Sequence, residues 1–313
     1  MSSPRCCICF LTDAKYLLPT LLAASQARRH TSPEVAAVSV FFMHDGTGAE
    51  QYRRYFAEAS VEFVAVDRSR IDAMSMYSAR LFLDDFLDKR YSEILYMDAD
   101  VQVVASLDEL AGVELPNGKF LAARDPFVIC SDWDAARLKD IRSYYAGIGI
   151  EGEKLENYFN SGVLRASRQT WREISLLARD LIAQQVEPFR FHDQDALNLV
   201  AQDRCLPMSF KWNFPAFFRS FLPPDALETR IEHFMSNPRP WFGPFRPWGW
   251  RAYAPYVGLV KQYPELAGMM KLSVQGYAKY ALQQEYKRWT ERRTWGRPAT
   301  LKRIVEIEGQ AVL

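Results

Sequence analysis

The chain has 313 residues, of which 49% are hydrophobic and 25% charged, the balance of a globular protein that can bury a sizeable core. A formal net charge of +1 gives no reason to expect a nucleic-acid partner. Apolar runs stay shorter than the roughly 18 residues of a membrane-spanning helix, and no signal peptide is expected. The five cysteines show neither zinc spacing nor a disulfide framework, which favours reduced core thiols in a cytoplasmic protein.

The first third of the chain alternates between short apolar runs and segments with helical periodicity. Strands are predicted at residues 6–11, 35–43, 61–66 and within 91–104, and helices at 16–29, 50–59 and 78–87. Strand followed by helix with short connections predicts an α/β fold, a Rossmann-like, mostly parallel sheet flanked by helices.

The pattern is looser after residue 108, with strands predicted at 120–123, 158–166 and 231–234 and helices at 133–145, 171–185 and 196–202. Gly147, Gly149 and Gly152 match G-x-G-x-x-G, but a dinucleotide site also needs a strand before the glycines and a long helix after them. The flanking residues fit neither, so we predict a glycine-rich loop and discard a nicotinamide cofactor. Asp193 and Asp195 precede a predicted helix, and we expect one of them to cap it.

Two aspartates follow the apolar run 94–97, in the sequence Asp98-Ala99-Asp100. Ligands bind beyond the carboxyl ends of strands in an open α/β sheet, where these two side chains would face one ligand. Two close carboxylates repel each other unless a cation lies between them, which suits Mn²⁺ or Mg²⁺ bound to a phosphate. Taken alone, a D-x-D sequence is more often the start of a surface turn. Asp13 also follows a predicted strand, so we expect it at the same edge of the sheet as Asp98, where the carboxyl ends of the strands lie.

Seven ordered segments resemble those of the retaining glycosyltransferases of family 8, which have the GT-A fold. They are T-D-A-K-Y (12–16), S-A-R-L (78–81), L-Y-M-D-A-D-V (95–101), F-N-S-G-V-L (159–164), D-Q-D-A-L-N (193–198), K-W-N (211–213) and H-F-M-S-N-P-R-P-W (233–241). The resemblance implies transfer of a hexose, glucose or galactose, from a UDP-sugar to a hydroxyl of a glycan or glycolipid acceptor. Lipopolysaccharide or other surface polysaccharide synthesis is the implied process.

The resemblance also assigns ligands. Asp98, Asp100 and His233 would hold Mn²⁺, or Mg²⁺, against the donor diphosphate, and an imidazole beside two carboxylates suits Mn²⁺ better. The nucleotide and donor sugar would be bound by Thr12, Asp13, Tyr16, Arg80, Asp98, Ala99, Asp125, Asn160, Ser236 and Arg239. Asp13 would hydrogen bond the base and Tyr16 would stack on it, although Tyr16 could instead pack at a helix start.

The same resemblance places Asp193 and Gln194 at the face of the sugar that a nucleophile would use. An amide is a weak nucleophile, so attack by the acceptor on the face of the leaving diphosphate is favoured over a covalent sugar intermediate. Arg80 would reach the diphosphate or the sugar, or would lie on a solvated helix face.

Four positions depart from the family pattern. Ala14 and Lys15 stand where many relatives carry Asp and Asn, Ser236 where glycine is usual, and Arg239 where lysine is usual. Arginine keeps the charge but changes the geometry, so these differences weaken the donor assignment more than the enzyme class.

Residues 1–245 are predicted to form the catalytic domain and residues 246–313 a basic and aromatic helical extension. Aromatic side chains such as Trp289 alternate there with lysines and arginines. This composition suits a helix on the anionic inner face of a membrane. It equally suits a charged helix that packs on the catalytic domain or forms an oligomer contact.

Three other classes compete with the transferase. A sugar nucleotidyltransferase should carry a glycine-rich, lysine-containing loop after its first strand, and residues 12–16 do not form one. An aspartyl phosphatase carries its D-x-D after the first strand, whereas here it follows the fourth. A glycan-binding pseudoenzyme of the same fold is the remaining alternative, and the intact Asp98, Asp100 and His233 set argues against it.

Overall fold

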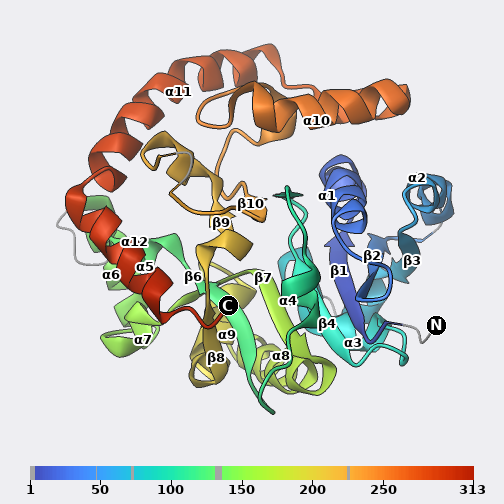
Figure 1. The fold of residues 1–313 in the computed structure, drawn as a ribbon, viewed down its shortest axis with the longest axis horizontal. Helices are drawn as coiled ribbons and strands as arrows, with labels where there is room; N and C mark the ends of the chain where they lie inside the picture. The colour runs from blue at the N-terminus through green and yellow to red at the C-terminus, as the bar shows by residue number, and fades with distance from the viewer. Residues whose placement is uncertain (1–3, 47, 72–73, 131–135, 224–225) are drawn as a thin grey trace.

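A seven-stranded sheet forms the centre of the computed structural model, which describes residues 4–46, 48–71, 74–130, 136–223 and 226–313 (Figure 1). Its strands, in spatial order, are β3 (Glu62–Asp67), β2 (Ala36–His44), β1 (Cys6–Thr12), β4 (Glu93–Met97), β7 (Phe159–Ser167), β6 (Phe120–Arg124) and β8 (Cys205–Met208). The strands pair in parallel except β7, which runs antiparallel to β4 and β6. The predicted α/β fold with a mostly parallel sheet is confirmed.

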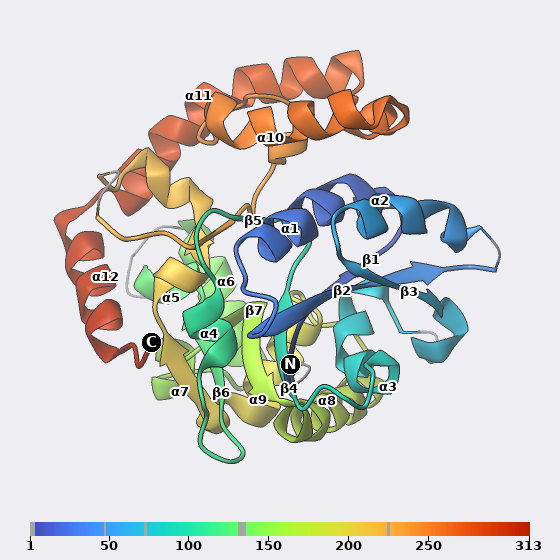
Figure 2. The same cartoon turned by 45° about the vertical axis from the view of Figure 1, so that its right-hand side comes forward.

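Helices cover both faces of this sheet. They are α1 (Leu17–Arg29), α2 (Arg53–Glu58), α3 (Leu83–Phe86), α4 (Asp108–Gly112), α5 (Pro126–Ile129), α6 (Ala136–Gly147), α7 (Glu153–Glu156), α8 (Arg168–Ala183) and α9 (Asp193–Ala201). Figure 2 shows α1 and α2 on one side of β1–β3 and α3 and α8 on the other. Strand β1 is buried on both faces: Ile8 and Phe10 join the cluster that contains Leu21 of α1, and Cys9 joins the cluster with Trp171 of α8.

The segment 91–104 forms two strands, of which only the first, β4, which ends before Asp98, was predicted. The chain leaves β4 at Asp98, whose N–H donates to the carbonyl of Gly162 at 2.8 Å, and turns through Ala99 and Asp100. It then enters β5 (Val101–Val103), which lies in a second sheet with β10 (Ile231–His233) and β9 (Phe214–Pro215). The antiparallel register of β5 with β10 places Val101 opposite His233.

Several smaller predictions are decided by the structure. The segment predicted as a helix at 78–87 is a 3-10 turn, Met76–Phe82, followed by the short α3. The glycine-rich segment follows α6 instead of a strand, which confirms that it is no dinucleotide loop. All five cysteines are free and four are buried, as predicted. Trp133, where a helix was expected to begin, lies outside the described residues.

The C-terminal extension consists of α10 (Gly249–Gln262), α11 (Val274–Trp295) and α12 (Pro298–Gln310), which arch along the outer edge of the molecule (Figure 1). Helix α10 packs on α1 and α12 packs on α5. Glu308 of α12 accepts hydrogen bonds from Ser209 Oγ at 2.6 Å and from the Phe210 N–H at 2.7 Å. The extension therefore packs on the rest of the chain, one of the arrangements expected from its composition.

The same extension leaves large side chains exposed, among them Trp250, Tyr286 and Trp289. No helix among the described residues is long and apolar enough to cross a bilayer. Contact with a membrane surface and the domain boundary at residue 245 both stay predictions.

Substitutions at two adjacent residues of α12, one buried and one exposed, test whether this helix packs against the rest of the protein. Ile304 is 4% exposed and Val305 is 70% exposed. We expect Ile304→Ala to lower the free energy of unfolding by about 2–5 kcal/mol because a buried side chain is lost. Val305→Ala should change it by less than about 0.5 kcal/mol. Denaturant unfolding of both variants checks this, and equal effects would show that α12 is not held against the core.

Candidate functional site

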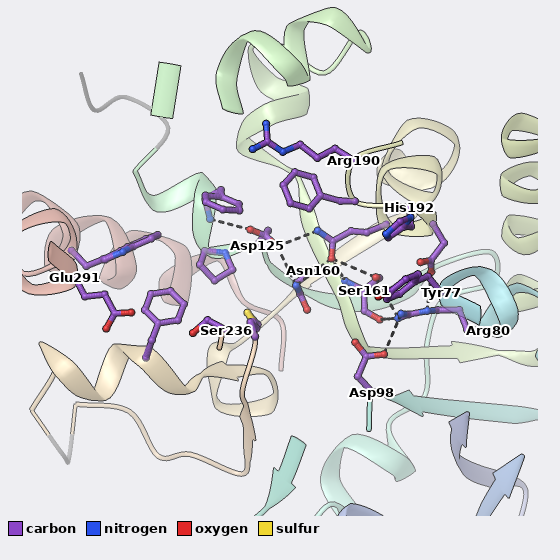
Figure 3. Close-up of a pocket in the computed structure, with 18 of the residues that line it drawn as sticks. Tyr77, Arg80, Asp98, Asp125, Asn160, Ser161, Arg190, His192, Ser236 and Glu291 are labelled. Carbon is purple, nitrogen blue, oxygen red and sulfur yellow. Dashed lines mark hydrogen bonds and ion pairs between the residues drawn. The ribbon is translucent and has the colours of Figure 1, made fainter. Parts of the chain in front are cut away.

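A pocket of about 430 Å³ lies where β4, β6 and β10 end and where β7 and α9 begin. Because β7 runs antiparallel to β4 and β6, its first residues lie beside their last ones. Seven predicted site residues line the pocket: Arg80, Asp98, Asp125, Asn160, Asp193, Gln194 and Ser236. Figure 3 shows those that it labels converging from these elements.

The three predicted metal ligands come together beside this pocket. The turn between β4 and β5 carries Asp98 and Asp100, and the pairing of β5 with β10 brings His233 to it. His233 Nε2 lies 3.3 Å from Asp100 Oδ1 and 3.9 Å from Asp98 Oδ2. One ligand atom of each residue lies within 4.8 Å of the others. Two carboxylates and an imidazole this close can hold one divalent cation.

A chain of hydrogen bonds selects the tautomer of a neutral His233. Asn160 Nδ2 donates to Asp125 Oδ2 at 3.1 Å, and the Gly162 N–H donates to Asn160 Oδ1 at 3.0 Å, which together orient the Asn160 amide. Asn213 Nδ2 donates to the same Oδ1 at 2.9 Å, so Asn213 Oδ1 accepts from His233 Nδ1 at 2.8 Å. A neutral His233 therefore carries its proton on Nδ1 and presents the Nε2 lone pair to the carboxylates. These atoms repel one another unless a cation lies between them, so the donor set fits a metal ion.

Gly162 leaves the space that His233 occupies. A Cβ atom at residue 162 would lie 2.2 Å from His233 Cε1 and 2.8 Å from Nδ1. Any side chain there would displace the imidazole, which is why the segment F-N-S-G-V-L has glycine at this position.

Arg239 supplies a positive charge to the same cluster. Its guanidinium donates to a carboxylate oxygen of Asp100 and to the carbonyl of Phe234. Burial raises the pKa of Asp100, but the charge of Arg239, the neighbouring His233 and a backbone hydrogen bond together outweigh burial and hold the pKa below its ordinary range. Asp100 is therefore ionised at neutral pH and available as a ligand.

Arg80 connects the predicted metal ligand Asp98 to Asp193 at the start of α9. Its guanidinium lies 3.1 Å from Asp98 Oδ1 and 2.8 Å from Asp193 Oδ2, and donates to the carbonyl of Ser161 at 2.7 Å. The alternative of a solvated helix face is wrong, because the side chain is only 10% exposed. Burial raises the pKa of Asp193 to about 6 even though Arg80 opposes the shift.

The amide of Gln194 is held on both sides. Its Oε1 accepts from the Ser161 N–H at 3.0 Å and from Asn160 Nδ2 at 3.2 Å, and its Nε2 donates to Asp125 Oδ2 at 3.1 Å and to Tyr158 OH at 3.2 Å. Burial raises the pKa of Asp125. Asp125, Asn160 and Gln194 thus form one rigid polar surface that can bind sugar hydroxyls in fixed directions.

The expectation that Asp193 or Asp195 caps α9 is wrong. The helix begins at Asp193 with His192 in the N-cap position. The Asp193 carboxylate pairs with Arg80, and Asp195 accepts from Tyr144 OH at 2.5 Å and Tyr158 OH at 2.6 Å. Asp195 also accepts from the Phe191 N–H at 2.9 Å, just before the helix, whereas Asp193 is held by a tertiary contact that the local sequence does not reveal.

The predicted base-binding residues lie outside the pocket lining, at the end of β1 and in the turn that follows it. Asp13 Oδ1 accepts from the Lys15 N–H at 2.9 Å and the Tyr16 N–H at 3.2 Å and so caps the 3-10 turn Ala14–Tyr16. Thr12 is buried. Tyr16 is 38% exposed and packs edge-on against Trp241, with ring centroids 5.8 Å apart.

Other residues of the site were missed from the sequence. Asn213 belongs to the K-W-N segment but had no role assigned to it. Tyr77 and His192 line the pocket with their rings stacked at 4.3 Å, and Lys287 and Glu291 of α11 also line it. Tyr77 and His192 directly precede the recognised segments 78–81 and 193–198, and Lys287 and Glu291 lie in α11, so all four are outside the segments that the sequence singled out.

The sequence matches the model of a known protein family over most of its length. The model of glycosyl transferase family 8 matches residues 7–244. The lipopolysaccharide glucosyltransferase WaaO of Escherichia coli K12 is 26% identical over 181 residues, which cover 55% of this chain and 49% of that protein. General stress protein A of Bacillus subtilis is 25% identical over 197 residues, which cover 56% of this chain and 62% of that protein. The chain spans less than two thirds of either relative.

Solved structures show the same fold at low identity. The galactosyltransferase LgtC in complex with donor and acceptor sugar analogues gives a TM-score of 0.56 at 22% identity, covering 87% of this chain and 99% of that one. The bifunctional glycosyltransferase WbbM gives a TM-score of 0.67 at 15% identity, covering 87% and 52%. These likenesses confirm the predicted GT-A fold.

The pKa of Asp193 predicts a pH dependence of stability. Between about pH 6 and its ordinary pKa of 3.8, the folded protein holds a proton on Asp193 that the unfolded chain releases. Stability therefore rises as the pH falls through this window. Relative to Asp193→Asn, the wild-type free energy of unfolding should rise by up to about 3 kcal/mol from pH 7 to pH 4. Denaturant unfolding across this range measures the difference, and a constant difference would contradict the prediction.

Proposed function

The chain belongs to glycosyltransferase family 8, and we propose that it is a hexosyltransferase that uses a UDP-sugar donor. It moves glucose or galactose to a hydroxyl of a glycan or glycolipid, with retention at the anomeric carbon, in lipopolysaccharide or surface polysaccharide synthesis. The observation that carries the proposal is the Asp98, Asp100 and His233 cluster beside a pocket lined with hydroxyl-binding groups. A cytoplasmic enzyme with peripheral membrane contact through the exposed aromatic and basic side chains of α11 is part of the proposal.

Asp98, Asp100 and His233 would hold Mn²⁺, with Mg²⁺ as the second candidate. When bound, the cation would neutralise charge that develops on the leaving diphosphate, a contribution worth several kcal/mol. Arg239, which contacts Asp100, and Arg80, which contacts Asp98, add positive charge at the same place. Asp98 and Asp100 are ligands in this proposal and not attacking groups.

The contacts of Asp193 and Gln194 favour attack by the acceptor itself. Asp193 is paired with Arg80, and the Gln194 oxygen already accepts two hydrogen bonds, so both are poor nucleophiles. The acceptor oxygen would bond to the anomeric carbon on the face that the diphosphate leaves. The bond to the diphosphate breaks, and a phosphate oxygen takes the acceptor proton. Asp193 and Gln194 would instead orient the sugar.

The remaining donor contacts are also proposals. Asp13 and Tyr16 would hold the uracil base and Thr12 and Ala99 would contact the nucleotide. Asp125 and Asn160 would hold sugar hydroxyls, and Ser236 would contact the diphosphate.

Donor hydrolysis tests the proposed function. The protein should release UDP from UDP-glucose or UDP-galactose in the presence of Mn²⁺, and EDTA should abolish the release. Asp100→Asn should lower the rate at least about a hundredfold, because a metal ligand with a fixed charge is lost. Binding of UDP-sugar without hydrolysis or transfer would favour the pseudoenzyme. Formation of UDP-sugar from UTP and a sugar phosphate would identify a nucleotidyltransferase.

Asn213 should control metal affinity through His233. Asn213→Leu removes the acceptor of the Nδ1 proton, and we expect Mn²⁺ affinity to fall about 10- to 100-fold. Titration calorimetry with MnCl₂ measures the affinity, and melting curves establish that the variant is folded. The same exchange at the exposed Asn117 is the control and should leave the affinity unchanged. Unaltered Mn²⁺ binding by a folded Asn213→Leu protein would exclude His233 as a ligand held in this way.

A further inference from the structure

One wall of the pocket is built by α11, whose residues lie beyond the segment 7–244 that the family model matches. We propose that this wall binds a saccharide acceptor and that the Glu291 carboxylate accepts a hydrogen bond from an acceptor hydroxyl. The inference rests on the proposed transferase function and assigns the acceptor side of the same pocket.

The residues that α11 contributes share one helix face. They are Lys287, Thr290, Glu291 and Trp295; Thr290 and Glu291 follow Lys287 by three and four positions and Trp295 follows Glu291 by four, the spacing of neighbours on a helix surface. Tyr286 and Trp289 of the same helix are exposed and do not line the pocket. The helix therefore presents a polar stripe to the pocket that is separate from its exposed aromatic side chains.

Glu291 lies across the pocket from the metal cluster. Figure 3 shows it on the opposite side from Asp98 and Arg80, with Asp125 and Ser236 between. If the diphosphate binds at Asp98 and the donor sugar at Asp125, the space beside Glu291 is where an acceptor would approach that sugar.

Contacts at two places hold this wall in position. Trp295 is 5% exposed and packs on Phe217, with ring centroids 5.1 Å apart. Lys287 Nζ donates to Ser236 Oγ at 2.8 Å and to the carbonyl of Asn237 at 2.6 Å, in the loop that follows β10. The wall is therefore tied directly to the loop on which the diphosphate is proposed to bind. A wall held this way needs little reorganisation when an acceptor binds.

The chemistry of the wall suits a sugar ring. Glu291 is 8% exposed as a residue; its Oε1 lies 3.7 Å from the Lys287 ammonium, and its Oε2 accepts from Ser220 Oγ at 3.5 Å. A carboxylate has several acceptor sites, so it can bind a hydroxyl while it remains near the lysine. Hydrogen bonds to a charged acceptor are stronger than those between neutral groups. Phe217, which also lines this side, offers an apolar surface to the C–H groups of a ring.

Two matched variants of α11 test the assignment. Glu291→Leu keeps a side chain of similar length and removes its acceptors, whereas Glu285→Leu makes the same change at an exposed position of the same helix. With p-nitrophenyl β-glucoside and β-galactoside as acceptors, Glu291→Leu should raise the acceptor KM at least tenfold. Its donor KM should change much less, and its ratio of transfer to donor hydrolysis should fall by a similar factor. Glu285→Leu should leave all three values at their wild-type level.

The outcomes separate this inference from the proposed function. A wild-type protein that hydrolyses no sugar nucleotide contradicts the function itself. One that hydrolyses the donor but binds neither glycoside by saturation-transfer NMR in the presence of UDP and Mn²⁺ overturns the saccharide assignment. Equal acceptor KM values for wild type and Glu291→Leu overturn the role of Glu291. If Glu291→Leu does not fold, Thr290→Phe narrows the same wall and must raise the acceptor KM at least tenfold.

Discussion

The direction of the hydrogen bonds between Asp125 and His233 governs the candidate site. Asp125 can only accept when ionised, so the Asn160 amide is oriented towards it, and Asn213 is oriented in turn by Asn160. His233 then donates from Nδ1 and presents a lone pair to Asp98 and Asp100. Without a positive charge this arrangement brings three electron-rich groups together at short range. The residues that would hold the sugar hydroxyls, Asp125 and Asn160, therefore also orient the His233 imidazole so that its Nε2 lone pair can bind a metal ion.

Pairs of buried opposite charges hold the other acidic side chains of the pocket in place. Asp98 and Asp193 share Arg80, and Asp100 is paired with Arg239. Removing one partner from such a buried pair costs several kcal/mol because a charge is left uncompensated. Arg80 and Arg239 thus compensate the negative charge of three carboxylates that lie at the ends of neighbouring elements. The two guanidinium groups would also lie near a phosphate group bound in the pocket.

The sequence was sufficient to predict six of the seven strands of the central sheet, because apolar runs such as Cys6–Thr12 alternate with helical periodicity. The edge strand β8 was not predicted. Strand β5 was not predicted, since only tertiary pairing with β10 makes Val101 and Val103 part of a second sheet. Asp98 and Asp100 could be proposed as ligands from the residues alone. His233 could not, because nothing local separates it from other histidines, and the resemblance to the family was needed.

Two departures from the family pattern acquire a physical reason in the structure. Ser236 stands where glycine is usual, and its hydroxyl accepts from Lys287 of α11, a contact that glycine could not make. Arg239 stands where lysine is usual, and its Nη1 donates both to Asp100 and to the carbonyl of Phe234. Both changes fasten the loop after β10, one to α11 and the other to the metal cluster. The α11 wall and the altered loop are thus structurally coupled through Ser236, the one of the four departures that joins the extension to the pocket in the described contacts.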